Sequence, residues 1–367
     1  MSFAAHKVLL GGVSDASGFE SLISEGEVDP DDVISIVGKT EGNGGVKDYT
    51  RILADQAFRS ALLTLGTRST SEVEQIPMAW SGGTDGVISP NAVVLSRNQG
   101  SGGSNSLSRM AVGISMSEPI RPEDIGRPEM VNVMAEGVLV AMENAGISDP
   151  SDVHFVQTKT PLLTMESISD AARRGKTVFT HEPLESMAIS NGTAALGVGV
   201  ALGEIEMPRP EQIGHDLDLY CSVASCSSGV ELERGQIVVV GNAAGAGGRF
   251  RVGHSVMKDA IDSAGVYEAI REAGLPVSDG PLDPDLEGRI IQIFAKAEAD
   301  PRGVLRGHRQ VMLNDSDVHH HRQIKAAVGG VIAAAVDDPA IFVSVAALHQ
   351  GPPGGGPVAA IVELPDD

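Results

Sequence analysis

The stretch VHFVQTKT, residues 153–160, is a run of β-branched and apolar side chains that brings Lys159 close to its end. Two other stretches have the same character: VISIVGKT contains Lys39, and RIIQIFAKAE contains Lys296. Short runs of this kind, bounded by turn residues, are typical of buried β-strands. The sequence therefore predicts three strands of one type, each of which carries a lysine near its end.

A second order of features repeats after these three strands. Each is followed by a stretch of small residues with helical character, RILADQAFRSALL, NGTAALGVGVALGEI or RQIKAAVGGVIAAAV. Each helix is followed by a strand that ends in serine: Ser81 in IPMAWSGG, Ser227 and Ser228 in SVASCSSGV, and Ser344 in AIFVSVAA. Three copies of one order of elements indicate internal repetition, which is stronger evidence about the fold than any single local motif.

Two glycine-rich stretches separate the repeats. LSRNQGSGGSNSLSRM, residues 95–110, has the composition of a linker, and GNAAGAGGRFRVGH, residues 241–254, follows the apolar strand QIVVV. We expect three α/β units, at residues 1–105, 111–248 and 252–367. Units this short bury little core alone, so we expect them to pack around a common axis on which equivalent strand ends converge.

The composition excludes several classes of protein. The net charge of −22 comes from 27 basic and 49 acidic residues, and such a surface repels nucleic acid and anionic membranes. No apolar run approaches the ~18–20 residues of a membrane helix, and the first residues do not resemble a signal peptide. We expect a cytoplasmic protein that binds a small molecule, with Cys221 and Cys226 as buried, reduced thiols.

Lysine and serine together can perform nucleophilic catalysis. Burial and neighbouring positive charge both disfavour an ammonium group, so we expect a lowered pKa for at least one of the three lysines. A neutral lysine can take the proton of a serine hydroxyl. Gly82 and Gly229 each follow a serine, which frees a backbone N–H to stabilise an oxyanion. Solvated lysines and serines that bond their own backbone remain the alternative.

Three further cations lie near the starts of two of the small-residue helices. Arg51 is in KDYTRIL, and Arg322 and Lys325 are in HHHRQIK. They can hold carbonyl oxygens or the anionic form of a planar ring. Exposed helix charges are the alternative.

At this point the sequence resembles the ring-opening amidohydrolases, the family that comprises cyanuric acid hydrolase and barbiturase. The resemblance spans essentially the whole chain, in the stretches IVGKTEGNGGVKDYTR, WSGGTDGVISP, VQTKTPLL, SNGTAALGVGVALGEIEMP, ASCSSGVEL, VVGNAAGAGGR, DSDVHHHRQIKAAVGG and HQGPPGGGPVAAIV. It implies three similar units, each a sheet backed by helices, around a pseudo-threefold axis with a central barrel-like core. It also implies a homotetramer that uses no organic cofactor.

The resemblance implies that Lys159 is the general base and that a serine of SSGV is the nucleophile, with water hydrolysing the acyl-enzyme. Ser228 is preferred, because Ser228 followed by Gly229 matches Ser81 followed by Gly82; Ser227 is the alternative. The residues then expected to hold the ring are Lys39, Arg51, Ser81, Gly82, Asn191, Gly229, Lys296, Arg322, Lys325, Ser344 and Val345.

Three departures from the family pattern favour one substrate. Asn191 stands where an arginine is expected, Lys325 replaces another arginine, and Val345 follows the third serine in place of glycine. Barbituric acid has a CH2 where cyanuric acid has an N–H, so a less symmetric site suits it. The prediction is hydrolysis of barbituric acid to ureidomalonic acid in pyrimidine degradation. Cyanuric acid hydrolysis to carboxybiuret and biuret, or a non-catalytic ligand-binding scaffold, are the alternatives.

The sequence gives weaker evidence for three other candidate sites. QIVVVGNAAGAGG lacks the endings of a phosphate-binding loop, so we interpret it as a seam between units. A helix would spread His319, His320 and His321 around its axis, which argues against a three-histidine zinc site, although a zinc hydrolase remains the alternative mechanism. The loop HQGPPGGGPVA offers free carbonyls that suit Mg²⁺ or Ca²⁺ better than zinc, although a tight turn without metal remains the alternative. The family resemblance implies a structural cation there, with ligands from Glu298, Ala347, Gln350, Gly351, Pro352 and Gly355.

Overall fold

The computed structural model describes residues 1–98, 107–286 and 288–364, and it repeats one order of elements three times. The order is strand, helix, strand, helix and two further strands. The first unit contains β1 (Ser2–Leu9), α1 (Ser17–Ser24), β2 (Val33–Thr40), α2 (Thr50–Leu65), α3 (Thr70–Glu74), β3 (Met78–Gly82) and β4 (Asn91–Asn98). The second contains β5 (Arg109–Pro119), α4 (Pro128–Ala145), β6 (Val153–Pro161), α5 (Met165–Arg173), α6 (Pro183–Ala201), β7 (Ala224–Gly229) and β8 (Arg234–Ala243).

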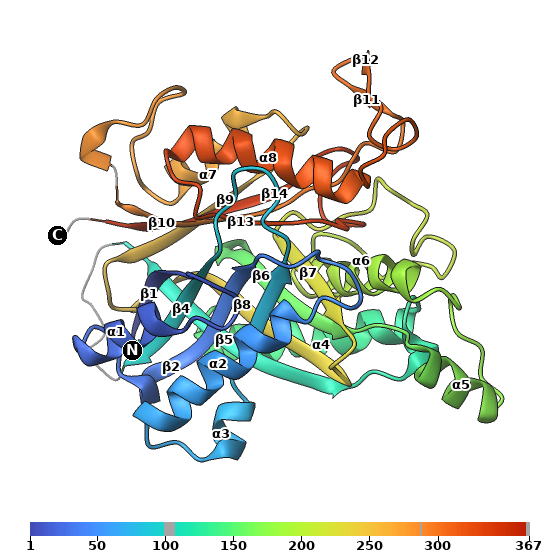
Figure 1. Cartoon of the computed structure of the whole chain (residues 1–367), viewed down its shortest axis with the longest axis horizontal. Helices are drawn as coiled ribbons and strands as arrows, with labels where there is room; N and C mark the ends of the chain where they lie inside the picture. The colour runs from blue at the N-terminus through green and yellow to red at the C-terminus, as the bar shows by residue number, and fades with distance from the viewer. Residues whose placement is uncertain (99–106, 287, 365–367) are drawn as a thin grey trace.

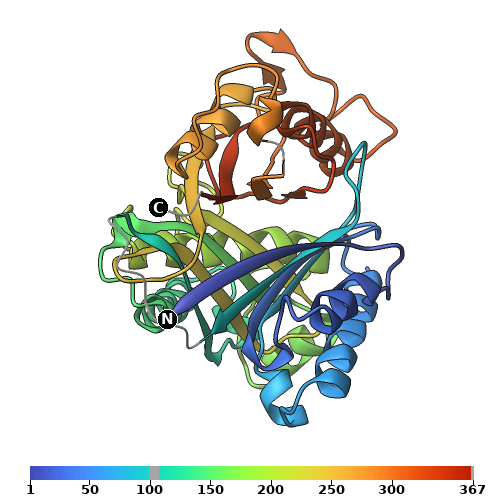
Figure 2. The same ribbon diagram turned by 90° about the vertical axis from the view of Figure 1, so that its left-hand side faces the viewer.

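The third unit adds one small hairpin to the same order. It contains β9 (Phe250–Met257), α7 (Ser263–Glu272), β10 (Ile290–Lys296), the hairpin strands β11 (Val304–Leu305) and β12 (His308–Arg309), α8 (His320–Val336), β13 (Phe342–Ser344) and β14 (Gly356–Glu363). The three units occupy three sectors around a centre, as Figures 1 and 2 show. The expected three-unit α/β fold is confirmed, whereas the expected boundary at residue 105 lies outside the described residues.

The three sheets have one topology. Each has four strands in the spatial order first, fourth, second, third, as in β1-β4-β2-β3. The second and third strands of each unit are parallel, and a helix connects them. Parallel neighbours require such a crossover, which explains why each small-residue helix lies between a lysine strand and a serine strand.

Both faces of each sheet are buried, which explains the uninterrupted apolar strands. In β4, Val93 and Leu95 face a core that all three units share, while Ala92 and Val94 face the helices of the first unit. The shared core includes the stacked rings of Phe155 and Phe294, whose centroids are 4.4 Å apart. This arrangement forms the barrel-like centre.

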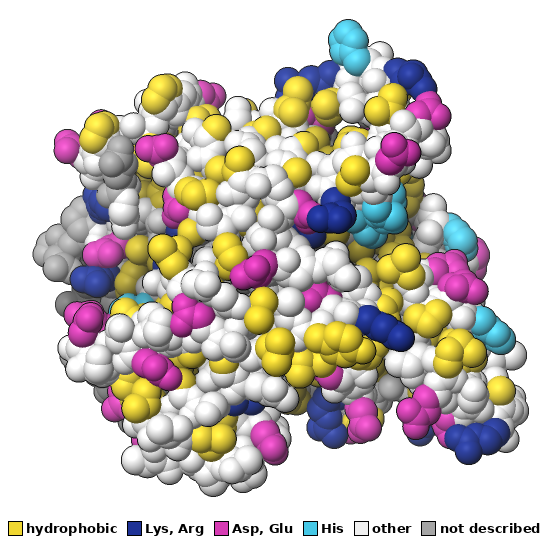
Figure 3. All heavy atoms as spheres, viewed as in Figure 1, with side chains coloured by type: hydrophobic (Ala, Val, Ile, Leu, Met, Phe, Trp, Pro, Cys, Tyr) yellow, Lys and Arg dark blue, Asp and Glu magenta, His cyan; other side chains and the backbone are white. Residues whose placement is uncertain are grey.

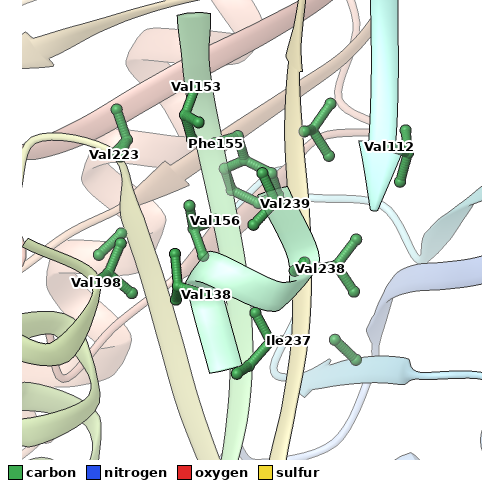
Figure 4. Close-up of a cluster of buried hydrophobic side chains, with 14 of the residues drawn as sticks. Val112, Val138, Val153, Phe155, Val156, Val198, Val223, Ile237, Val238 and Val239 are labelled. Atoms are coloured by element: carbon green, nitrogen blue, oxygen red, sulfur yellow. The ribbon is translucent and has the colours of Figure 1, made fainter. Parts of the chain in front are cut away.

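The second unit contributes most of the shared core. Figure 4 shows Val138 of α4 and Val198 of α6 close to strand residues such as Val156 and Val239. These helices therefore fix the outer side of the sheet that carries Lys159. The surface is different in character, because charged side chains of both signs are scattered over the face shown in Figure 3.

Proline-initiated turns precede the lysine strands. The 3-10 turns η1 (Pro30–Asp32), η3 (Pro150–Asp152) and η4 (Pro284–Leu286) lie before β2, β6 and β10, and a further turn, η2 (Pro122–Asp124), lies before α4. Proline suits the first turn because its φ is already helical and its missing N–H is not needed there. The side chains of Asp29 and Asp149 accept N–H bonds and cap two of these turns.

Several expectations need adjustment. The helix expected to start after Ser190 begins at Pro183, so Asn191 lies within α6 rather than near its start. The first helix of each unit was not predicted from the sequence. Both cysteines are free and buried, as predicted. No helix in the described ranges is long and apolar enough to cross a membrane. The homotetramer stays a prediction.

A glycine substitution tests the close contact between strand and helix. A Cβ on Gly113 would lie 1.9 Å from the Ala141 carbonyl oxygen of α4. Gly113→Ala should therefore lower the free energy of unfolding by about 1–3 kcal/mol or more, measured by urea denaturation. Gly330→Ala in α8 is the matched control, because its Cβ would have no neighbour within 4 Å and should be neutral or stabilising. Equal effects of the two substitutions would contradict this packing.

Candidate active site

The parallel strand pairs bring each lysine opposite a serine. Paired residues of a parallel ladder project from the same face of a sheet, so lysine and serine leave the sheet together. The three register pairs are Lys39 with Ser81, Lys159 with Ser227, and Lys296 with Ser344. One backbone arrangement thus presents the same two functional groups three times.

The register corrects the choice of serine in the second unit. Ser228 pairs with Thr160, one residue beyond Lys159, and its hydroxyl donates to the Met187 carbonyl at 3.2 Å on the opposite side of the sheet. Matching Ser228 to Ser81 on the basis of the following glycine was therefore wrong. Ser227 takes the equivalent position, and its hydroxyl is 3.3 Å from the Thr158 carbonyl.

The ends of the paired strands meet at one place. The Oγ atoms of Ser81 and Ser344 are 3.3 Å apart, which joins the first and third units. Lys296 Nζ donates to the Cys226 carbonyl at 2.8 Å, which joins the third and second units. The three units therefore contribute to one cluster, as the pseudo-threefold arrangement requires.

Two of the lysines are buried among neutral oxygen atoms. Lys39 Nζ is 3.1 Å from Ser81 Oγ and 3.0 Å from the Gly82 carbonyl, and burial lowers its pKa well below the usual range, aided by the positive charge of Lys325. Burial also lowers the pKa of Lys296 to about 8. The prediction that at least one of the lysines has a depressed pKa is confirmed.

Lys159 has a different neighbour. Its ammonium group forms an ion pair with Glu231, whose side chain lies in the loop after β7. Burial acts to raise the pKa of Glu231, but the attraction of Lys159 outweighs it, so the pKa of this carboxyl is lowered. Glu231 is therefore an ionised carboxylate that accepts a hydrogen bond from Lys159 Nζ.

The helix positions that follow the lysine strands are equivalent between the first two units. Thr40 bonds Thr50 at 2.8 Å, and Thr160 bonds Ser190 at the same distance, so Arg51 and Asn191 occupy corresponding places. The Arg51 guanidinium is buried and donates to backbone carbonyls of residues 45 and 48, which fixes the loop before α2. Arg51 thus supports the site through that loop.

Asn191 is buried beside the third unit. Its Nδ2 donates to the Ala346 carbonyl at 3.3 Å, close to Val345. Among the described residues its Oδ1 has no hydrogen-bond partner. Two of the three departures from the family pattern thus lie together, and they include a free buried acceptor.

The remaining cations gather around Asp85. Lys325 Nζ is buried, 2.9 Å from Asp85 Oδ2 and 3.3 Å from the Gly82 carbonyl. Arg322 is mostly exposed and reaches the other Asp85 oxygen at 2.9 Å. Lys325 is therefore part of the cluster, whereas Arg322 lies at its rim.

The two carboxylates of the cluster were not predicted from the sequence. Asp85 lies four residues after Ser81, and Glu231 lies four residues after Ser227. The corresponding residue of the third unit is Leu348. The spacing was available in the sequence, but its meaning depends on knowing that Ser227 is the equivalent serine.

Comparisons with known proteins agree with this arrangement. The model of the family described as amidohydrolase ring-opening protein matches residues 4–363. Barbiturase 2 and Barbiturase 1 of Nocardioides sp. are 62% and 58% identical to the chain over 363 residues, covering 98% of it and 97% and 98% of their own lengths. A solved cyanuric acid hydrolase superposes with a TM-score of 0.92 at 39% identity, covering 99% of both chains.

The chain belongs to the ring-opening amidohydrolases. It is a cyclic amide hydrolase, which excludes the non-catalytic scaffold considered from the sequence. The three sheets with their common topology are the repeated units that the solved relative shares.

The loop expected to hold a structural cation lies next to the cluster. Glu298 accepts N–H bonds from Ala347 and Ala299, and burial raises the pKa of its carboxyl. The backbone has positive φ at Ala346, His349, Gly351 and Gly354, so carbonyls turn in several directions over a short stretch. The Gln350 side chain already binds the Cys226 N–H at 2.6 Å.

The donor set fits a divalent cation. Glu298 supplies a poorly solvated carboxylate, and the tight turns supply carbonyl oxygens, the ligands that Mg²⁺ and Ca²⁺ prefer. His320 Nδ1 and His321 Nε2 also lie 3.8 and 3.9 Å from Glu298 Oε1, and His320 Nδ1 has no hydrogen-bond partner among the described residues. The histidines were interpreted from the sequence as ordinary helix-start residues, and the structure adds this shared contact with Glu298.

The lowered pKa of Lys296 predicts a pH-dependent stability. The folded group has a pKa of about 8 against 10.5 ordinarily, so between these values the unfolded chain binds more protons. The cost of burying the ammonium is thus present below pH 8 and lost as pH rises to 10.5. This group should make the free energy of unfolding rise by up to about 1.4 kcal/mol per pH unit in that window.

Urea unfolding of wild type and Lys296→Met across this window measures the effect. The stability difference, wild type minus variant, should increase with pH. Lys176→Met, at an exposed position, is the control and should show no such trend. A pH-independent difference for Lys296→Met would show that folding does not lower the pKa of this lysine.

Proposed function

We propose that the hydrolase opens the ring of barbituric acid to give ureidomalonic acid, with Ser227 as the nucleophile and Lys159 as the base. The observation that carries the assignment is the difference in burial among the three serines. Ser81 and Ser344 are buried, whereas Ser227 is only half-buried and its position faces Lys159. A nucleophile must be reachable by the substrate, and Ser227 is the most accessible of the three.

Glu231 can accept the proton that Lys159 must lose before it acts as a base. The proton is on Lys159 Nζ in the ion pair, and the carboxylate of Glu231 is in contact with that atom. A ring that covers Glu231 excludes water from it and favours the neutral carboxyl form. Proton transfer from Lys159 to Glu231 then leaves a neutral amine opposite Ser227.

The reaction follows as nucleophilic acyl transfer. Neutral Lys159 takes the Ser227 proton as Oγ bonds to a ring carbonyl carbon, which gives a tetrahedral oxyanion. When the C–N bond breaks, the Lys159 ammonium returns the proton to the departing nitrogen. A water molecule, deprotonated by Lys159, then attacks the ester carbon and releases Ser227 with the open-chain acid.

The other two pairs hold the ring. Lys39 and Lys296 direct N–H donors into the cluster beside Ser81 and Ser344, and such donors suit the carbonyl oxygens of a cyclic ureide. Asn191 Oδ1, which has no hydrogen-bond partner within the described part of the chain, is an acceptor that suits a ring N–H. An acceptor at one corner of the cluster and cationic donors at the others match a ring with unlike edges.

The preference for barbituric acid rests on this asymmetry and on the relatives. Barbiturases are the relatives at 58–62% identity, while the solved cyanuric acid hydrolase is at 39%. Cyanuric acid is the second candidate, because the three Lys–Ser pairs themselves are nearly symmetric. A cytoplasmic role in pyrimidine degradation is part of the same proposal.

We also propose that Glu298 and oxygen atoms of the turn at 347–355 bind a structural divalent cation, Mg²⁺ or Ca²⁺ rather than zinc. When bound, it would neutralise the Glu298 carboxylate and stiffen this turn. The turn follows Ser344 and Val345, whose carbonyl accepts a 2.8 Å bond from Lys296. The chain's own contribution is to hold Lys296 and Ser344 at the ring.

Serine substitutions test the choice of nucleophile. Ser227→Ala should lower kcat for ring opening by at least about 10³-fold, since it removes the attacking atom. Ser228→Ala is the matched control and should retain most activity, because its hydroxyl faces the Met187 carbonyl. Lys159→Ala should lose activity while circular dichroism shows a folded protein. Loss of the substrate's ultraviolet absorbance gives the rates, and a selective loss in Ser228→Ala would reverse the assignment.

Substitution of Val345 tests the substrate assignment. Wild type should have a higher kcat/KM for barbituric than for cyanuric acid. Val345→Gly removes the apolar side chain from one corner and should shift the ratio of the two kcat/KM values toward cyanuric acid by about tenfold. Val311→Gly, at an exposed position, is the control and should leave the ratio unchanged. Faster opening of cyanuric acid by wild type would refute the barbiturate preference without refuting ring opening.

A further inference from the structure

Three potential metal ligands meet where the second and third units touch. His154 comes from β6, His254 from β9, and Glu272 from the end of α7. The two Nδ1 atoms are 2.9 Å apart, and Glu272 Oε2 is 3.7 Å from His154 Nδ1 and 3.4 Å from His254 Nδ1. Two of these residues belong to the third unit and one to the second, so the cluster spans their junction.

The spacing of the three atoms matches a metal coordination sphere. Zinc binds histidine nitrogen and carboxylate oxygen at about 2.0–2.1 Å, which makes the edge of its tetrahedron about 3.3–3.4 Å. The three distances of 2.9, 3.4 and 3.7 Å scatter around that edge. An ion at their centre would need only small side-chain shifts.

The donors are also held in suitable positions. His154 is buried at the junction between the two units. Glu272 is held in place by the backbone N–H of His254. Its side chain is 41% exposed, which leaves a solvent-facing direction for entry and for a fourth ligand.

His154 occupies a special backbone position. In all three units the lysine strand shifts its register by one residue against its antiparallel neighbour, at Ile34, His154 and Ile291. Such a bulge re-aims one side chain. The bulge is therefore present in all three units, but only in the second unit does the bulged residue have a side chain that can bind a metal ion.

At the equivalent junction between the first and second units, the corresponding positions among the described residues carry no such ligands. Gly113 and Gly253 pack in the same way against the helix ends at Ala145 and Ala273, so Ile114 corresponds to His254 and Asn144 to Glu272. Together with Ile34, these residues place apolar and amide groups where the other junction has two imidazoles and a carboxylate. Packing of this fold therefore does not require the His–His–Glu trio.

We propose that His154, His254 and Glu272 bind a divalent transition-metal ion such as Zn²⁺, which clamps the second unit to the third. The site is separate from the reacting cluster, because His154 and Lys159 are five residues, about 16 Å, apart along β6. It is also separate from Glu298. Its role is structural: an ion that binds only the folded chain stabilises it by mass action.

A metal-free arrangement makes the opposite prediction. One imidazole Nδ1–H could donate to the other Nδ1, with Glu272 as a neighbouring acceptor. That hydrogen bond would explain the 2.9 Å contact without any ion. In that case added zinc would neither bind tightly nor stabilise the protein.

Titration of the full chain distinguishes the two. Protein stripped with a chelator is titrated with Co²⁺, followed by visible absorption, and with Zn²⁺, followed by calorimetry and thermal melting. Wild type should bind one ion per chain with the intense absorption of a tetrahedral Co²⁺ site, and its Tm should rise with added Zn²⁺. Absence of that binding and of the Tm rise would overturn the proposal.

Variants locate the ion. The double variant His154→Ile, His254→Ile copies the other junction and should fold, while its affinity falls about 100-fold or more. Glu272→Gln, at a half-exposed position, provides a second variant if the double variant fails to fold. His321→Ala removes a histidine near Glu298 and should keep the tetrahedral Co²⁺ signal. Loss of that signal in His321→Ala with retention in Glu272→Gln would place the ion at Glu298 and refute this site.

Discussion

The register between a lysine strand and a parallel serine strand is the constraint on which this structure depends. Because the two strands are parallel neighbours with both faces of the sheet covered, one hydrogen-bond ladder decides which residues share a face. A slip of one residue would turn each lysine into the helix layer and each serine away from the centre. The small-residue helices, the shared core and the meeting of the units all serve to hold that register three times.

Burial of three lysines close together costs free energy, because each ammonium group loses water and lies near other positive charges. The cluster offsets this cost in two ways. Lys39 and Lys296 are surrounded by hydroxyl and carbonyl oxygens, and burial lowers their pKa, so each can lose its charge more easily than a solvated lysine. The charge of Lys159 is instead balanced by the carboxylate of Glu231 in an ion pair. The second unit, in which the lysine has a carboxylate partner, is also the unit with the accessible serine, and for this reason we propose Lys159 and Ser227 as the reacting pair.

The sequence predicted what repeats and missed what depends on pairing. Apolar strands ending near lysine, and the strand–helix–strand order, were readable because they are local. Ser228 was chosen because Ser-Gly is a local pattern, whereas the correct match requires the ladder that sets Ser227 against Lys159. Three Asp-Pro turns before the lysine strands were also present in the sequence, as at Asp29 and Asp149, and would have supported the repeat. The contact of Lys159 with Glu231 leaves only a spacing of four residues after the equivalent serine in the sequence, and that spacing has no meaning until the ladder identifies Ser227.

Repetition also explains where new chemistry can arise in this fold. Symmetry fixes the backbone, including the bulge at Ile34, His154 and Ile291, because the same ladder must form in each unit. The side chain at such a position is free to differ, since it lies at a junction and not in the ladder. Asn191 illustrates the same freedom within the cluster, where it stands in the place that Arg51 has in the first unit. A repeated backbone thus supplies equivalent positions, and substitution in a single copy gives each position a separate task.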